Sequence, residues 1–139
     1  MEYNINDVLI HKKSYSKWTI KSKDYIYNDN NLIIDKEFSL YNNNNKNIII
    51  NEIDIFKYFI KKENFRTYQS QNRLNILFYY IKHYNNDLQP ELIKNDENYI
   101  FYRLNKKDHI KELLIDDIIS YNNLDLIYKA KDLTQNYNK

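Results

Sequence analysis

The chain contains no Cys and no Gly, and its only Pro is Pro90. Without Cys it forms neither a disulfide nor a thiolate metal site, which argues against an oxidising compartment. Without Gly it lacks the turns of a P-loop, a dinucleotide-binding fold or a nucleophile elbow, because those turns need φ > 0 or a close backbone approach to phosphate. Several large enzyme classes are therefore excluded.

A strong charge of one sign and long apolar runs are also missing. The chain has 21 Lys and Arg against 19 Asp and Glu, so its net charge of +2 gives no strong overall attraction for a charged partner. Runs such as Ile48–Ile50 are too short to span a membrane. The N-terminal residues lack the basic-then-apolar order of a signal peptide. We therefore expect an intracellular, cytoplasmic protein without a membrane partner.

Asn, Ile, Lys and Tyr together make up more than half of the 139 residues. All four have codons built from A and T, so the composition predicts an AT-rich replicon, such as a cytoplasmic virus or a yeast linear plasmid. A chain of this length buries enough apolar surface for a real core. We expect one compact unit with an α+β fold.

The hydrophobic pattern changes near residue 50. Residues 1–50 form a segment rich in β-hairpins, because short runs of β-forming residues alternate with Asn and Asp. The turns are expected at 28–31 and 42–47, where Asn and Asp take the place of Gly. Residues 51–139 form a mostly helical part with one inserted strand near 99–104. The expected helices are 52–64, 69–84, 108–121 and a last one that Asn123 caps.

Apolar residues at helical spacing predict the core of this second part. The side chains expected to be buried are Phe56, Phe59, Leu74, Leu77, Phe78, Ile81, Leu113, Leu114 and Ile118.

The titratable residues predict no catalytic or metal site. His11, His83 and His109 are the only histidines, and none has the paired spacing of a metal site. Asp116 and Asp117 are adjacent, so on a helix they point about 100° apart and do not form a catalytic pair. We expect a protein that is not an enzyme and needs no cofactor.

Residues 11–23 contain five Lys and no acid, interleaved with aromatic residues. Lys neutralises phosphates and aromatic rings stack on bases, so this segment is typical of a single-stranded nucleic-acid site. In the alternative interpretation the Lys side chains are merely solvated and Trp18 fills the core. The candidate DNA- or RNA-binding residues are Lys13, Tyr15, Lys17, Trp18, Lys21 and Tyr25.

A second set of motifs lies between residues 65 and 128. Thr67 and Arg73 stand six residues apart where the helix is expected to begin, and a strand, a turn and the run Glu112–Ile118 follow. This order resembles the omega-type small subunit of multisubunit DNA-dependent RNA polymerases. Eukaryotic and viral members of that family carry Thr-x-Tyr-Glu-x-x-Arg at the start of a helix, then a strand, a turn and a Glu-Leu-rich helix.

The resemblance implies a role in transcription, as a non-catalytic subunit that latches the largest polymerase subunit and aids assembly. It implies that Thr67, Arg73 and Arg103 contact this larger protein. The chain has only three Arg, and Arg makes planar, bidentate contacts that Lys does not. Single-stranded nucleic-acid binding is the alternative function, and a viral host-interaction protein is a third hypothesis.

Overall fold

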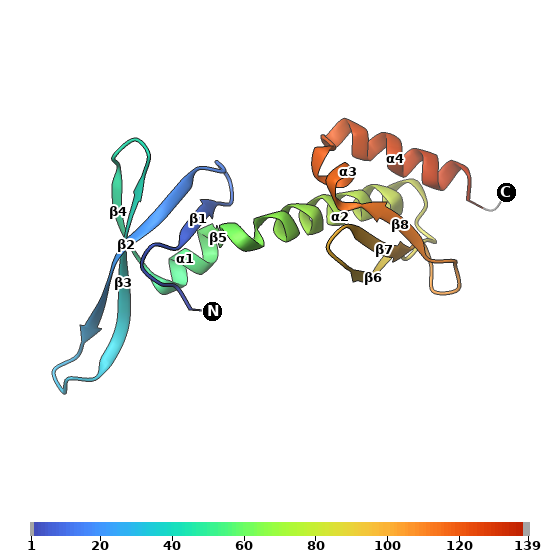
Figure 1. The fold of residues 1–139 in the computed structure, drawn as a ribbon. Coiled ribbons are helices and arrows are strands. Elements are labelled where there is room, and N and C mark those ends of the chain that lie inside the picture. The colour runs from blue at the N-terminus through green and yellow to red at the C-terminus, as the bar shows by residue number, and fades with distance from the viewer. Residues whose placement is uncertain (1, 138–139) are drawn as a thin grey trace. The chain divides into compact units, whose positions relative to one another are not determined.

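The structure is a computed structural model that describes residues 2–137 (Figure 1). Its contacts divide the chain into two compact units, one ending at Phe65 and the other beginning at Arg66. The change of composition near residue 50 lies earlier than this boundary. The fold is α+β, but both units contain a sheet. The expectation of a single strand inserted in the helical part is therefore wrong.

The first unit is built on a five-stranded antiparallel sheet with the strand order β4-β3-β2-β1-β5. One short helix and one 3₁₀ turn accompany it. The elements are β1 (Val8–His11), β2 (Lys17–Tyr27), β3 (Ile33–Asn42), β4 (Asn47–Asn51), α1 (Glu52–Tyr58), β5 (Phe59–Lys61) and η1 (Lys62–Asn64).

The two hairpin turns expected from the Asn clusters are confirmed. In each turn the side-chain oxygen of the first Asn, Asn28 or Asn42, accepts two backbone N–H groups. A later Asn in each turn takes the left-handed conformation, Asn31 with φ 59° and Asn45 with φ 59°. Asn thus supplies both the positive φ and the local hydrogen bonds that a Gly-free chain needs at a hairpin.

Helix α1 is shorter than expected because Phe59–Lys61 leaves the helix and pairs with β1 as β5. Only Ile55 of this helix is fully buried, and Phe59 is buried from its place in β5. Phe56 is 64% exposed, so its expected burial is wrong. The main hydrophobic cluster of this unit lies on one face of the sheet and consists of Tyr3, Leu9, Ile20, Phe38, Leu40, Ile55 and Phe59. Ile10 of β1 is also buried, but it lies on the other face, opposite Lys17.

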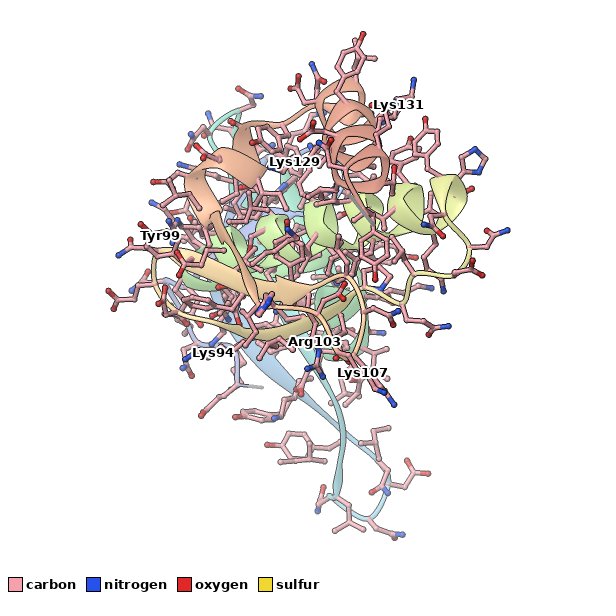
Figure 2. All side chains as sticks on the ribbon, turned by 90° about the vertical axis from the view of Figure 1, so that its right-hand side faces the viewer. Lys94, Tyr99, Arg103, Lys107, Lys129 and Lys131 are labelled. Atoms are coloured by element: carbon pink, nitrogen blue, oxygen red, sulfur yellow. The ribbon has the colours of Figure 1, made fainter. Side chains whose placement is uncertain are left out.

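The second unit packs helices against one face of a three-stranded antiparallel sheet with the order β6-β7-β8. In the two views α2 lies between this sheet and α4 (Figures 1 and 2). The elements are α2 (Phe65–Tyr84), β6 (Glu91–Asn95), β7 (Tyr99–Arg103), β8 (Lys111–Leu114), α3 (Ile115–Ser120) and α4 (Asn123–Gln135).

The helix expected over 108–121 is a strand followed by a short helix. Lys111–Leu114 pairs with β7, and the helix begins only at Ile115. The buried residues Leu113, Ile115 and Ile118 follow a strand spacing and then a helical spacing. Leu114 is 40% exposed, so its expected burial is wrong. Strand β6 was also missed, since this short segment directly follows Pro90, which indicates a loop.

Most of the remaining expected core of the second unit is found. Leu74, Leu77 and Ile81 of α2 are buried, while Phe78 is only partly buried against the same cluster. The sheet contributes Ile100, Tyr102 and Leu113, the bend after β7 contributes Leu104, and α3 and α4 contribute Ile115, Ile118, Leu126 and Ala130.

Helix α4 is capped by Asn122, one residue earlier than expected. The Asn122 side chain accepts the Asp125 N–H at 2.8 Å, and the Asp125 carboxylate accepts the Asn122 N–H at 3.0 Å. We expect Asn122→Ala to lower the free energy of unfolding by about 1 kcal/mol, because it removes one side of this capping box. Urea denaturation measures the change, and Asn122→Asp, which keeps an acceptor oxygen, is the control. Equal losses in the two variants would contradict this account.

Candidate functional surfaces

The Lys-rich segment of β2 divides between two faces of the first sheet. Trp18 and Ile20 point toward the core, whereas Lys17 and Thr19 point to the opposite face. A bulge between Ile20 and Ser22 leaves Lys21 without a direct partner on β3. Lys21 is exposed and adjoins Ser22, which lies opposite Ser39 on the side of the sheet away from the core, so we assign Lys21 to the same side as Lys17.

A small basic surface results on the side of the sheet away from the core. Tyr41 of β3 lies directly opposite Thr19 and is 39% exposed, so Lys17 and Lys21 flank it diagonally. Lys13, in the turn between β1 and β2, is exposed as well. We call Lys13, Lys17, Lys21 and Tyr41 the lysine face. The first acids farther along this face are Asp24 and Glu37, which lie opposite each other.

The three aromatic residues expected beside these Lys lie elsewhere. Trp18 packs on the core, where its Nε1 donates to Ser16 Oγ at 2.9 Å. Tyr15 sits in the turn before β2 with φ 60°, and its ring meets the Phe65 ring edge-on at 5.4 Å. Tyr25 shares the face of Phe38, because the β2–β3 register places it opposite Lys36. The aromatic ring on the lysine face is thus Tyr41, which sequence reasoning missed.

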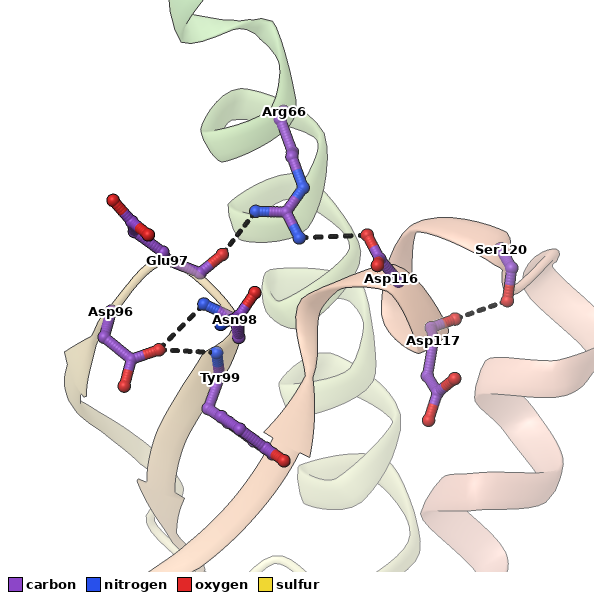
Figure 3. Close-up of polar contacts among 8 residues, drawn as sticks. All are labelled: Arg66, Asp96, Glu97, Asn98, Tyr99, Asp116, Asp117 and Ser120. Atoms are coloured by element: carbon purple, nitrogen blue, oxygen red, sulfur yellow. Dashed lines mark hydrogen bonds and ion pairs between the residues drawn. The ribbon is translucent and has the colours of Figure 1, made fainter.

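In the second unit, a set of polar contacts fixes the start of β7 (Figure 3). Arg66 donates to the Glu97 carbonyl and to Asp116 Oδ1, the latter at 2.9 Å. Asp96 Oδ1 accepts the backbone N–H groups of Asn98 at 2.8 Å and Tyr99 at 2.7 Å. These two N–H bonds lower the pKa of Asp96. The contacts hold the turn before β7 and so set the position of Tyr99.

Strand β7 alternates strictly between the core and the outside. Ile100 and Tyr102 are 1% and 2% exposed, and burial raises the pKa of Tyr102 to about 12. Tyr99, Phe101 and Arg103 point to the opposite side of the sheet. The Tyr99 and Phe101 ring centroids are 6.2 Å apart.

Two cations accompany these rings on the outer side of the sheet. Lys94 of β6 lies opposite Phe101, with its Nζ 5.1 Å from the ring centroid. Arg103 forms an ion pair with Glu91 of β6. Figure 2 labels Lys94, Tyr99 and Arg103 along this sheet. We call Tyr99, Phe101, Lys94 and Arg103 the β7 face.

The three residues that the polymerase resemblance marks as partner contacts are not brought together. Thr67 and Arg73 are both on α2, but six residues correspond to about 240° of helical rotation, so they leave the helix on different sides. Arg103 lies on the outer side of the sheet. Arg73 is partly exposed and, among residues 2–137, has no hydrogen-bond or ion-pair partner.

The acidic residues have local structural contacts instead of a shared site. Asp116 binds Arg66, and the Asp117 carbonyl accepts the Ser120 hydroxyl at 2.6 Å (Figure 3). Within residues 2–137, no group of three or more His, Asp or Glu side chains is placed to hold a metal ion.

Comparisons with protein families, with curated proteins and with solved structures found no match for this chain. No helix in the described part of the chain is both long and apolar enough to cross a membrane.

Proposed function

We propose that this chain is a non-catalytic, cytoplasmic protein that binds single-stranded nucleic acid through the lysine face. The observation that carries the proposal is the placement of exposed Lys17 and Lys21 around Tyr41, with exposed Lys13 in the adjoining turn. Only part of the basic segment noted in the sequence contributes, because Lys12 donates to the Phe56 carbonyl and Lys23 lies on the core side.

The chemistry of the lysine face suits a single strand better than a duplex. Lys side chains attract phosphates as point charges, and an exposed Tyr ring stacks on any base that is not paired. Ile49, which is 73% exposed beside this region on β4, adds an apolar contact for a base. In a duplex the bases are already stacked, so Tyr41 gains no ring partner there.

Fluorescence anisotropy with a labelled oligonucleotide tests the proposal. We expect the chain to bind single-stranded DNA or RNA more tightly than a duplex of the same length. The affinity should fall steeply as salt rises, because bound phosphates release their counterions when Lys neutralises them. Equal affinity for single strand and duplex at every salt concentration would contradict a stacking role for Tyr41.

The second candidate is the small polymerase subunit, and the guanidinium of Arg73, for which residues 2–137 provide no partner, favours it. A partly exposed Arg without an internal partner has a free planar fork for a carboxylate or for backbone carbonyls of a larger protein. Two parts of the resemblance have less support, since Glu112–Leu114 forms strand β8 and Arg103 already pairs with Glu91. The candidate therefore depends on Arg73.

We expect Arg73→Ala to weaken co-purification with the largest polymerase subunit by about 2–5 kcal/mol if the guanidinium is buried there. The free energy of unfolding of the isolated chain should change by no more than about 0.5 kcal/mol. Arg73→Lys should restore binding only in part, because Lys lacks the planar fork. Lys82→Ala, at an exposed position on the same helix, is the control. Recovery of the large subunit that is unchanged by Arg73→Ala would refute this candidate.

A further inference from the structure

Within residues 66–137, no helix packs on the outer side of the β6–β7–β8 sheet. The buried cluster of this unit joins α2, α3 and α4 to the inward residues of the sheet, such as Ile100 and Tyr102. On the other side Tyr99 is 37% exposed, Leu114 is 40% exposed, and Lys94 and Glu112 are exposed. The Tyr99 ring is therefore exposed on this side, whereas the Phe101 ring is half-buried beside Lys94.

Two aromatic rings on one strand can each receive a base. Tyr99 and Phe101 are two residues apart on one strand, which places their Cα atoms about 6.6 Å apart along it. Rings at this spacing on an antiparallel sheet each receive one unstacked base of a single strand, as in sheet-type RNA-binding modules. The Asp96 turn and the Arg66 contacts hold the first of the two rings in place.

The charges on this face nearly cancel. Lys94 and Arg103 are positive, Glu91 neutralises Arg103, and Glu112 lies opposite Phe101 on β8. Phosphate attraction is therefore weak here, unlike on the lysine face. Any affinity for a single strand must come mainly from stacking on the rings, with Lys94 as the cation that is free to leave Phe101 for a phosphate.

We propose that the β7 face is a second single-strand site, which binds bases by stacking on Tyr99 and Phe101. This inference rests on the proposed function, because it adds a base-binding site to the phosphate-binding lysine face of the first unit. The two sites differ in their main contribution: the lysine face combines phosphate attraction by Lys with stacking on Tyr41, whereas the β7 face binds mainly by stacking.

An abasic oligonucleotide separates base stacking from phosphate binding, because it keeps every phosphate and lacks the bases. The variants are Tyr99→Leu and Phe101→Leu, which keep apolar bulk on the strand but remove the ring. We expect each to weaken binding of a normal oligonucleotide by about 5-fold or more, while binding of the abasic oligonucleotide stays unchanged. The slope of affinity against salt should also stay unchanged, since no phosphate contact is lost.

Two further variants test whether the effect depends on the β7 face. Tyr79→Leu removes a ring that is 67% exposed on α2, and it should leave binding of both oligonucleotides unchanged. Glu112→Gln removes the carboxylate opposite Phe101 and should strengthen binding a few-fold at low salt, because it removes repulsion of the phosphates. Far-UV circular dichroism confirms that each variant is folded before binding is compared.

The outcomes distinguish this inference from the proposed function. If the wild-type chain retains no oligonucleotide, both are overturned. If the chain binds but Tyr99→Leu and Phe101→Leu bind the normal oligonucleotide as tightly as wild type, the β7 face is not a base-binding site and the lysine face stands alone. Equal weakening by Tyr79→Leu would also overturn the assignment, since the effect would then not depend on the β7 face.

Discussion

Replacing Lys13, Lys17 and Lys21 together with Ala is expected to abolish retention of single-stranded oligonucleotides at physiological salt. Each lost phosphate contact lowers the slope of log affinity against log salt by about 0.7 for a single strand, so three contacts lower it by about 2. At about 0.15 M salt this corresponds to a loss of affinity on the order of 50-fold. Anisotropy titrations at several salt concentrations measure both quantities.

A matched triple variant controls for net charge. Lys57, Lys62 and Lys82 are exposed and lie outside the lysine face, so their replacement by Ala removes the same formal charge. We expect this control to reduce affinity slightly and to leave most of the salt slope in place, because long-range attraction is screened beyond about 8–10 Å at these salt concentrations. Equal losses in the two triple variants would show that only net charge matters and that the lysine face is not a site.

Tyr41→Ala separates stacking from charge on the same face. A ring that stacks on a base neutralises no phosphate. Tyr41→Ala should therefore weaken binding without changing the slope of log affinity against log salt, as expected for the β7 rings. The triple Lys variant and Tyr41→Ala together therefore separate the role of the Lys side chains from that of Tyr41. A surface that binds nucleic acid without distinct contacts would not show this separation.

The parts of the fold that local chemistry determines could be predicted from the sequence. The Asn28 and Asn42 turns are such a case, because a side-chain oxygen and a positive φ act within a few residues. Strand β7 is another, since its run of β-forming residues is short and distinct. Helix α2 was also found, although it begins at Phe65, earlier than its apolar spacing indicated.

The parts where strand pairing overrides a helical pattern could not be predicted. Phe59–Lys61 continues the helical pattern of α1, yet it becomes β5 because β1 offers it a ladder of hydrogen bonds. Lys111–Leu114 likewise pairs with β7 as a strand, although its apolar residues have helical spacing. In both cases pairing with another strand outweighs a local preference worth only tenths of a kcal/mol per residue. The partner strand is distant in sequence for β5, whereas for β8 it is the preceding strand.

The candidate sites show the same division. The Lys residues of the lysine face are recognisable in the sequence. Tyr41 lies beside them only because of the β2–β3 register, and Trp18 packs on the core instead. The β7 face follows from strict alternation in Tyr99–Arg103, so Tyr99 and Phe101 could have been paired from the sequence alone. What the sequence did not contain is which side of that strand the helices cover.

The largest expected effect on stability is that of Leu77→Ala in α2. Leu77 is 0% exposed and belongs to the cluster that joins α2 to the sheet and to α3 and α4. Emptying such a site removes buried apolar surface and leaves a cavity that the surrounding side chains fill only partly. We therefore expect the free energy of unfolding to fall by about 2–5 kcal/mol.

Urea denaturation followed by far-UV circular dichroism measures this loss, since most helical residues belong to α2, α3 and α4. Leu77→Met keeps nearly the same volume and should cost less than about 1.5 kcal/mol. Asn75→Ala, at an exposed position on the same helix, should change the free energy by no more than about 0.5 kcal/mol. A loss for Leu77→Ala as small as that for Asn75→Ala would mean that α2 does not pack against the sheet through this residue. The support for the open β7 face would then fail too, because that face is the outer side only if α2 covers the inner one.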